Sequence, residues 1–162
     1  MPLAEIGIIG GSGLYEMDGL SDVRSVRVET PCGDPSDEVI LGSLSGRRVA
    51  FLPRKGKLHG LLPSEINFRA NIYALKKLGV ERILSVSAVG SMKEEIAPGH
   101  IVIPDQFVDL TRRRVSTFFG SGVVGHAALG DRVCPETAGI LAESGRSVGA
   151  TVHPKGTYVC IE

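Results

Sequence analysis

The chain has 162 residues, of which 18 are basic and 18 acidic, so its formal net charge is zero. This length can hold one domain with a sizeable core, and the balanced charge argues against nucleic-acid binding or an acidic disordered tail. No run of about 18 apolar residues predicts a membrane span, and the N-terminus lacks the basic segment of a signal peptide. Three cysteines lie far apart and predict no disulfide framework and no CxxC pair, which fits a reducing cytoplasm.

Apolar runs separated by glycine-containing turns predict an alternation of strands and helices. The strand-like segments, in chain order, are 6–9, 39–44, 47–52, 83–86 and 101–103, with a strand or strand pair over 151–161 around Lys155-Gly156. Ser45-Gly46 predicts a two-residue hairpin turn between the second and third of these. The run 83–86 is too apolar for a solvent-facing strand and is expected to be buried.

Two segments predict helices. The first follows an N-cap expected at Ser64 and ends before Gly79, which suits the position just past a helix end. The second covers residues 135–144, with proline at a tolerated first-turn position, while residues 115–131 are irregular and rich in Gly and Ser. Strands with helical crossovers imply an α/β fold, with a mixed, largely parallel sheet flanked by helices in a single domain over residues 1–162.

The glycine cluster 10–13 directly follows the first strand. Its glycines free backbone N–H groups to turn toward an anion, and the Ser12 hydroxyl adds a donor. A tight turn explains the same residues equally well. A dinucleotide site is a weaker alternative because the third glycine of G-x-G-x-x-G is missing, and no P-loop Gly-Lys-Ser/Thr occurs.

A basic loop follows the strand 47–52. Four potential cations lie within the six residues 54–59, beside a glycine. A guanidinium and an ammonium together suit a phosphate dianion, whereas a solvated surface loop is the usual reason for such a charge run.

Small residues over 87–91 follow the strand-like run 83–86. Such residues let a ligand approach the backbone closely, and ligands of open α/β sheets bind beyond the carboxyl ends of strands. His100 and His153 are isolated in the sequence, and no His/Cys spacing predicts a metal site.

Four phrases carry a resemblance to a known family: IGIIGGSGLY, FLPRKGKLHGLLPSEINFRANIYALKKLG, AVGSMKEEIAPGHIVIPDQF and RRVSTFF. Together they resemble the methylthioadenosine phosphorylase branch of the trimeric purine nucleoside phosphorylases, from Ile6 to Glu162. The resemblance implies a purine nucleoside phosphorylase-like fold. Because the family's pattern continues beyond Glu162, the chain is expected to lack the family's C-terminal part.

The resemblance also implies site residues. Phosphate would be bound by the residues Ser12, Arg54, Lys55, Ser87 and Ala88. In the family's motif Arg-His-Gly-x-x-His, Lys55 stands where the first histidine is expected and His59 matches the second. The nucleoside side would be lined by Val89 and Gly90, and His126 would reach a neighbouring subunit's site.

The implied reaction is phosphorolysis of 5'-methylthioadenosine, or a related purine nucleoside, to free purine and 5-methylthioribose 1-phosphate in purine and methionine salvage. Inorganic phosphate is the co-substrate; no cofactor and no metal are expected, and a cytoplasmic homotrimer or higher multiple is implied. The family's purine-reading acid lies beyond residue 162, so 6-amino and 6-oxo specificity both stay open. The main alternative is a truncated, non-catalytic fragment that binds phosphate and needs a second polypeptide.

Overall fold

The computed structural model describes residues 2–11, 18–56, 60–128, 130 and 133–162. It divides into two compact units, one formed by Met1–Ala88 with Arg114–Phe118 and the other by Val89–Arg113 with Phe119–Glu162. The expectation of a single domain over residues 1–162 stays a prediction. Among the described residues, no helix is both long enough and apolar enough to cross a membrane.

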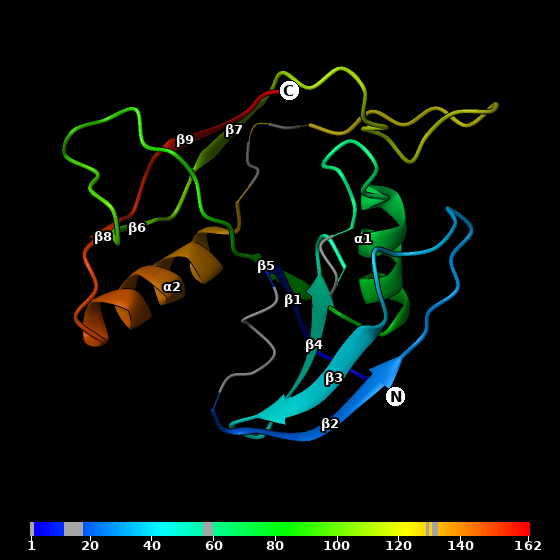
Figure 1. Ribbon diagram of the computed structural model, residues 1–162, viewed down its shortest axis with the longest axis horizontal. Helices are drawn as coiled ribbons and strands as arrows, with labels where there is room; N and C mark the ends of the chain where they lie inside the picture. Colours follow the sequence, from blue (N-terminus) through cyan, green and yellow to red (C-terminus); the bar gives the residue numbers. More distant parts are fainter. Residues whose placement is uncertain (1, 12–17, 57–59, 129, 131–132) are drawn as a thin grey trace. The chain divides into compact units, whose positions relative to one another are not determined.

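A five-stranded mixed sheet forms the first unit (Figure 1). Its strands are β1 (Ile6–Gly10), β2 (Leu20–Val26), β3 (Val39–Leu44), β4 (Arg47–Pro53) and β5 (Arg82–Ser85), in the order β2-β3-β4-β1-β5. β4, β1 and β5 run parallel, whereas β2, β3 and β4 form an antiparallel meander. The predicted mixed α/β sheet is therefore confirmed.

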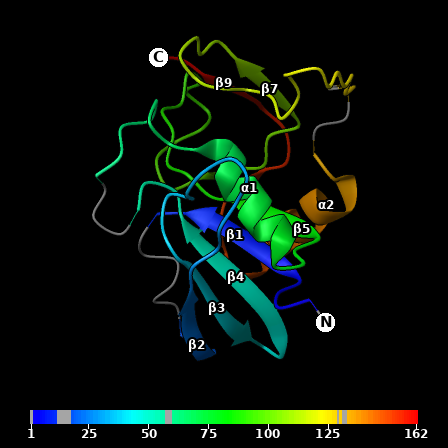
Figure 2. The same ribbon diagram turned by 90° about the vertical axis from the view of Figure 1, so that its right-hand side faces the viewer.

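The helix α1 (Phe68–Lys77) lies over one face of this sheet (Figure 2). Ala74 and Leu75 of the helix share a buried cluster with Leu52 of β4 and with neighbouring strand residues. A second cluster, with Phe51 at 1% exposure, fills the opposite face of the same strands. Because alternate residues of β4 point to opposite faces, its apolar run supplies both clusters.

The predicted hairpin turn is confirmed between β3 and β4. Ser45 and Gly46 both have positive φ, at 48° and 77°. Two consecutive positive φ values define the primed turn whose twist matches that of paired strands. Ser45 accepts a conformation that glycine or asparagine would adopt at lower cost.

The N-cap of α1 is Asn67, so the prediction of Ser64 is wrong. The Asn67 side chain accepts a hydrogen bond from Ala70 N at 3.1 Å. Ser64 lies inside a preceding turn, in which Glu65 N donates to the Leu62 carbonyl at 2.9 Å. At the other end Gly79 has φ +95°, and it follows the C-cap as predicted.

β5 is exposed, which corrects the expectation of a buried strand. It is the last strand of the sheet, and only Leu84 of its four residues is half-buried. Ile83 is 39% exposed. Apolar composition indicates a strand, but it does not reveal that the strand lies at a sheet edge.

The second unit contains two parallel strand pairs and a helix. β6 (Ile101–Val102) pairs with β8 (Val152–His153), and β7 (Gln106–Asp109) pairs with β9 (Thr157–Cys160). The predicted segment 151–161 thus forms two strands, which pair with earlier strands and not with each other. The helix α2 (Pro135–Ser147) extends the predicted 135–144 by three residues.

Candidate anion-binding site

Three parallel strands end together at one edge of the first unit's sheet. Gly10 of β1 is level with Pro53 of β4, and Ile9 is level with Ser85 of β5. Two backbone hydrogen bonds extend these pairings beyond the strands: Arg54 N donates to the Gly10 carbonyl at 3.0 Å and Val86 N donates to the Ile9 carbonyl at 2.9 Å. The segments after β4 and β5 therefore flank the end of β1, about 10 Å apart at the usual strand spacing.

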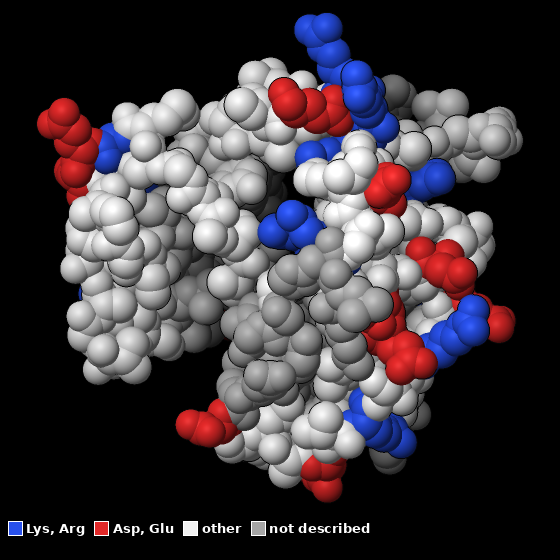
Figure 3. Space-filling model, in the orientation of Figure 1, with Lys and Arg blue, Asp and Glu red and all other residues white. Residues whose placement is uncertain are grey.

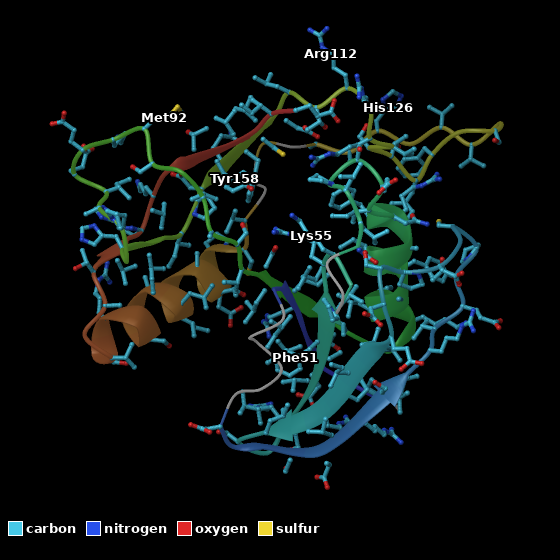
Figure 4. All side chains as sticks on the ribbon, in the orientation of Figure 1. Phe51, Lys55, Met92, Arg112, His126 and Tyr158 are labelled. Atoms are coloured by element: carbon cyan, nitrogen blue, oxygen red, sulfur yellow. The ribbon has the colours of Figure 1, made fainter. Side chains whose placement is uncertain are left out.

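Arg54 and Lys55 occupy the two central positions of a β-turn. Gly56 N donates to the Pro53 carbonyl at 3.1 Å, which closes the turn directly after β4. Gly56 has φ +73°, a conformation that favours glycine. Figure 4 shows Lys55 just beyond the carboxyl end of β4. The turn thus presents two consecutive cations at the strand ends.

These two cations suit a phosphate. Both side chains are half-buried, and partial burial strengthens their attraction for an anion relative to full exposure. A guanidinium can donate two parallel hydrogen bonds to phosphate oxygens, and an ammonium adds a compact charge. On the face drawn in Figure 3, described acidic and basic side chains both occur, and neither sign covers a large patch.

Ser87 and Ala88 follow β5 at the same edge of the sheet. Ser87 is half-buried and Ala88 is exposed. The structure therefore brings together two of the predicted segments, one with Arg54 and Lys55 and one with Ser87 and Ala88. Ser12 and His59 lie outside the described residues, although Gly11, which precedes Ser12, directly follows β1.

The predicted nucleoside residues belong to the second unit. Val89 and Gly90 continue the chain from Ala88 and are exposed, and His126 is exposed in an irregular segment. Their contribution to the same site stays a prediction.

A loop that was not expected from the sequence supports the basic turn. Residues 30–37 are tied to α1 by the side chains of Asn67 and Asn71, which lie one helical turn apart. Asn71 is the one buried polar residue among those the structure describes, with 2% exposure. Two asparagines four residues apart, at the N-cap and within the first turns of α1, could have drawn attention to these side chains, but they do not indicate which loop the side chains contact.

The chain belongs to the phosphorylase superfamily, because the model of that family matches residues 5–162. Within it, the similarity is to S-methyl-5'-thioadenosine phosphorylases. The protein of that name from Geobacter sulfurreducens is 63% identical over 158 residues, which cover 97% of this chain and 55% of that protein. The S-methyl-5'-thioadenosine phosphorylase from Thermofilum pendens is 52% identical over 162 residues, which cover 100% of this chain and 62% of that protein. The chain spans about half the length of the curated relatives it matches.

Solved structures agree with this assignment. A methylthioadenosine phosphorylase from an antarctic soil metagenomic library matches with TM-score 0.96 and 55% identity, over 100% of this chain and 57% of that chain. The methylthioadenosine phosphorylase of Schistosoma mansoni in complex with adenine matches with TM-score 0.89 and 35% identity. The match covers 98% of this chain and 65% of that chain. The matches confirm the predicted family and its purine nucleoside phosphorylase-like fold.

Proposed function

We propose that this protein phosphorolyses the N-glycosidic bond of 5'-methylthioadenosine or a related purine nucleoside. The observation that supports the proposal is the pair of cations, Arg54 and Lys55, held in a turn where three parallel strands end. In α/β sheets such strand ends are where ligands bind. The similarity to methylthioadenosine phosphorylases supplies the substrate class.

In the proposed reaction a phosphate oxygen attacks the anomeric carbon of the ribose. The bond from that carbon to the purine nitrogen breaks, the purine leaves with a proton, and 5-methylthioribose 1-phosphate forms. The transition state is oxocarbenium-like, as in glycoside hydrolysis. A phosphate dianion held beneath the ribose stabilises that cation, so positioning and electrostatics supply most of the rate.

Each predicted site residue has a part in this proposal. Arg54 binds phosphate through bidentate hydrogen bonds from its guanidinium, and Lys55 adds a positive charge. Ser12, the Ser87 hydroxyl and the Ala88 N–H complete the phosphate site. Val89 and Gly90 line the nucleoside side, and His126 reaches the site of a neighbouring subunit.

The remaining parts of the proposal rest on the family alone. Phosphate is the co-substrate and no further cofactor takes part. The protein forms a homotrimer and works in the cytoplasm, in purine and methionine salvage.

A second candidate function is phosphate binding without catalysis, with turnover only in the presence of a second polypeptide. The residues proposed to bind phosphate lie within the part that this chain shares with its curated relatives, which is about half of their length. Holding one reactant without the other forfeits most of the proximity gain, roughly 7–11 kcal/mol.

Two variants, one just after the end of β4 and one at its start, test the phosphate site. Arg54→Ala should weaken the binding of inorganic phosphate, measured by calorimetry, by about 10- to 100-fold, because a hydrogen bond to a charged group is lost. Arg47→Ala is the matched control: Arg47 lies at the opposite end of the same strand, is 72% exposed and pairs with Glu5 at 3.4 Å. Its loss should leave the phosphate affinity unchanged. An equal loss in both variants, or no phosphate binding by the unaltered chain, would contradict the proposed site.

Adenine release from methylthioadenosine and phosphate separates the two candidate functions. Turnover that requires Arg54 supports the phosphorylase. Phosphate binding without adenine release supports the fragment.

A further inference from the structure

The loop 30–37 is clamped to α1 by two asparagine side chains. Asn71 accepts a hydrogen bond from Ser36 N at 2.8 Å and donates one from its Nδ2 to the Ser36 Oγ at 2.9 Å. Asn67 donates from its Nδ2 to the Cys32 carbonyl at 2.7 Å. The two amides therefore hold opposite ends of the same loop.

The end held by Asn71 lies against the basic turn. A methyl group placed on Gly56 would come within 3.1 Å of the Ser36 carbonyl oxygen and 3.6 Å of the Asp37 carboxylate. Gly56 closes the turn that carries Arg54 and Lys55. The backbone of the turn at Gly56 thus packs directly against Ser36, the residue to which Asn71 is hydrogen-bonded.

The burial of Asn71 indicates that its hydrogen bonds to Ser36 are specific. Burying a side-chain amide costs free energy unless its groups are hydrogen-bonded. Asn71 is 2% exposed, and its side-chain oxygen and nitrogen both form hydrogen bonds with Ser36. Two bonds to one residue fix that residue's position and orientation together.

We propose that Asn71 is a positioning residue of the anion site, acting through Ser36 and Gly56 on Arg54 and Lys55. The inference rests on the proposed phosphate site and extends it to a residue that touches no ligand. Anion binding by a turn requires that its donors are held in place before the ligand arrives. Asn71 holds these donors in place because it bonds Ser36, against which the turn packs, to the helix α1.

The test compares Asn71→Ala with Asn67→Ala in the 162-residue chain. Both variants remove an amide that ties the loop to α1, so both should lower stability to urea. Asn71→Ala should in addition weaken the binding of inorganic phosphate about tenfold, as losses in a supporting shell do. It should also shift the Gly56 amide resonance and speed its hydrogen exchange without any ligand. Asn67→Ala should leave the phosphate affinity within about twofold.

Ser36→Ala is a milder variant if Asn71→Ala fails to fold. It keeps the Ser36 N–H bond and removes only the hydroxyl that accepts from Asn71. It should weaken phosphate binding in the same direction and by less.

Equal loss of affinity in Asn71→Ala and Asn67→Ala would overturn the inference, because it would indicate general loosening of the loop. An unchanged Gly56 amide in Asn71→Ala or, where that variant does not fold, in Ser36→Ala would also overturn it. If the unaltered chain binds no phosphate, the proposed function fails. The Gly56 amide then still decides whether Asn71 holds the turn.

Discussion

The two units of this chain differ sharply in how much apolar surface they bury. The first unit fills both faces of a five-stranded sheet with packed side chains. Among the described residues of the second, only Ile103 and Ala142 are buried apolar residues, whereas Met92 and Val148 are 89% and 81% exposed. Segments with few buried contacts open at low free-energy cost. The candidate anion site therefore lies on the more rigid part of the chain, which is where a preorganised site is best supported.

The largest expected effect contrasts one phenylalanine from each unit. Phe51 is 1% exposed at the centre of the sheet, and Phe119 of the second unit is 46% exposed. Phe51→Ala should lower the free energy of unfolding by about 3–5 kcal/mol, because it removes buried area and leaves a cavity. Phe119→Ala should cost less than about 1 kcal/mol. Urea unfolding followed by circular dichroism measures both, and similar losses would show that the two units are equally packed.

The glycines that follow the two helices sharpen the same contrast. Gly79 and Gly149 both have positive φ, at 95° and 80°, and each follows a helix C-cap. A methyl group on Gly79 would overlap Pro2, whose Cα lies 2.8 Å away, whereas a methyl group on Gly149 meets open space.

Gly79→Ala should therefore cost about 2–3 kcal/mol, from backbone strain and overlap together. Gly149→Ala should cost only the strain, about 1 kcal/mol. Thermal unfolding of both variants provides the measurement. A larger loss for Gly149→Ala would contradict the difference in packing between the two helix ends.

The strands that could be predicted were those whose pattern is local. The apolar segments at 6–9, 39–44 and 47–52 became β1, β3 and β4, and Ser45-Gly46 formed the expected turn. β2 was missed because its side chains are mostly exposed and include charged residues. β7 was missed because polar residues flank its two apolar ones, so it forms no apolar run, and its partner β9 lies about 50 positions later. Pairing over such distances is not encoded in local propensity.

The residues of the candidate site also divide into those that local sequence could predict and those that it could not. The placement of Arg54, Lys55 and Ser87 at one sheet edge could be predicted because each follows a recognisable strand and parallel strands end at a common edge, whereas their role in phosphate binding was implied by the family resemblance. Asn71 and Ser36 could not be, since 35 residues separate them and only the folded chain brings them together. The cap of α1 shows a third case, in which Ser64 and Asn67 are both good capping residues and the turn at Leu62–Glu65 decides between them.

The smallest expected effect concerns the thiol at the start of α2. Cys134 is exposed and is the N-cap residue, although its sulfur makes no capping hydrogen bond of ordinary geometry. The Thr137 side chain, followed by the Thr137 backbone N–H, lowers the pKa of this thiol below its usual range. A lowered pKa stabilises the folded state above the ordinary thiol pKa, and that contribution is lost as the pH falls through the lowered value.

More Cys134 should therefore be thiolate at neutral pH, and the thiolate is the form that reacts. We expect iodoacetamide at pH 7 to alkylate Cys134 several-fold faster than the half-buried Cys32 of the first unit, with mass spectrometry of the peptides as the measurement. Thr137→Val removes the hydroxyl and keeps the backbone N–H, so it should raise the pKa part of the way back. The variant should slow alkylation at pH 7 and leave the rate at pH 10 unchanged, because the thiol is then ionised in either case. A pH profile that Thr137→Val does not move would show that the threonine side chain does not act on this thiol.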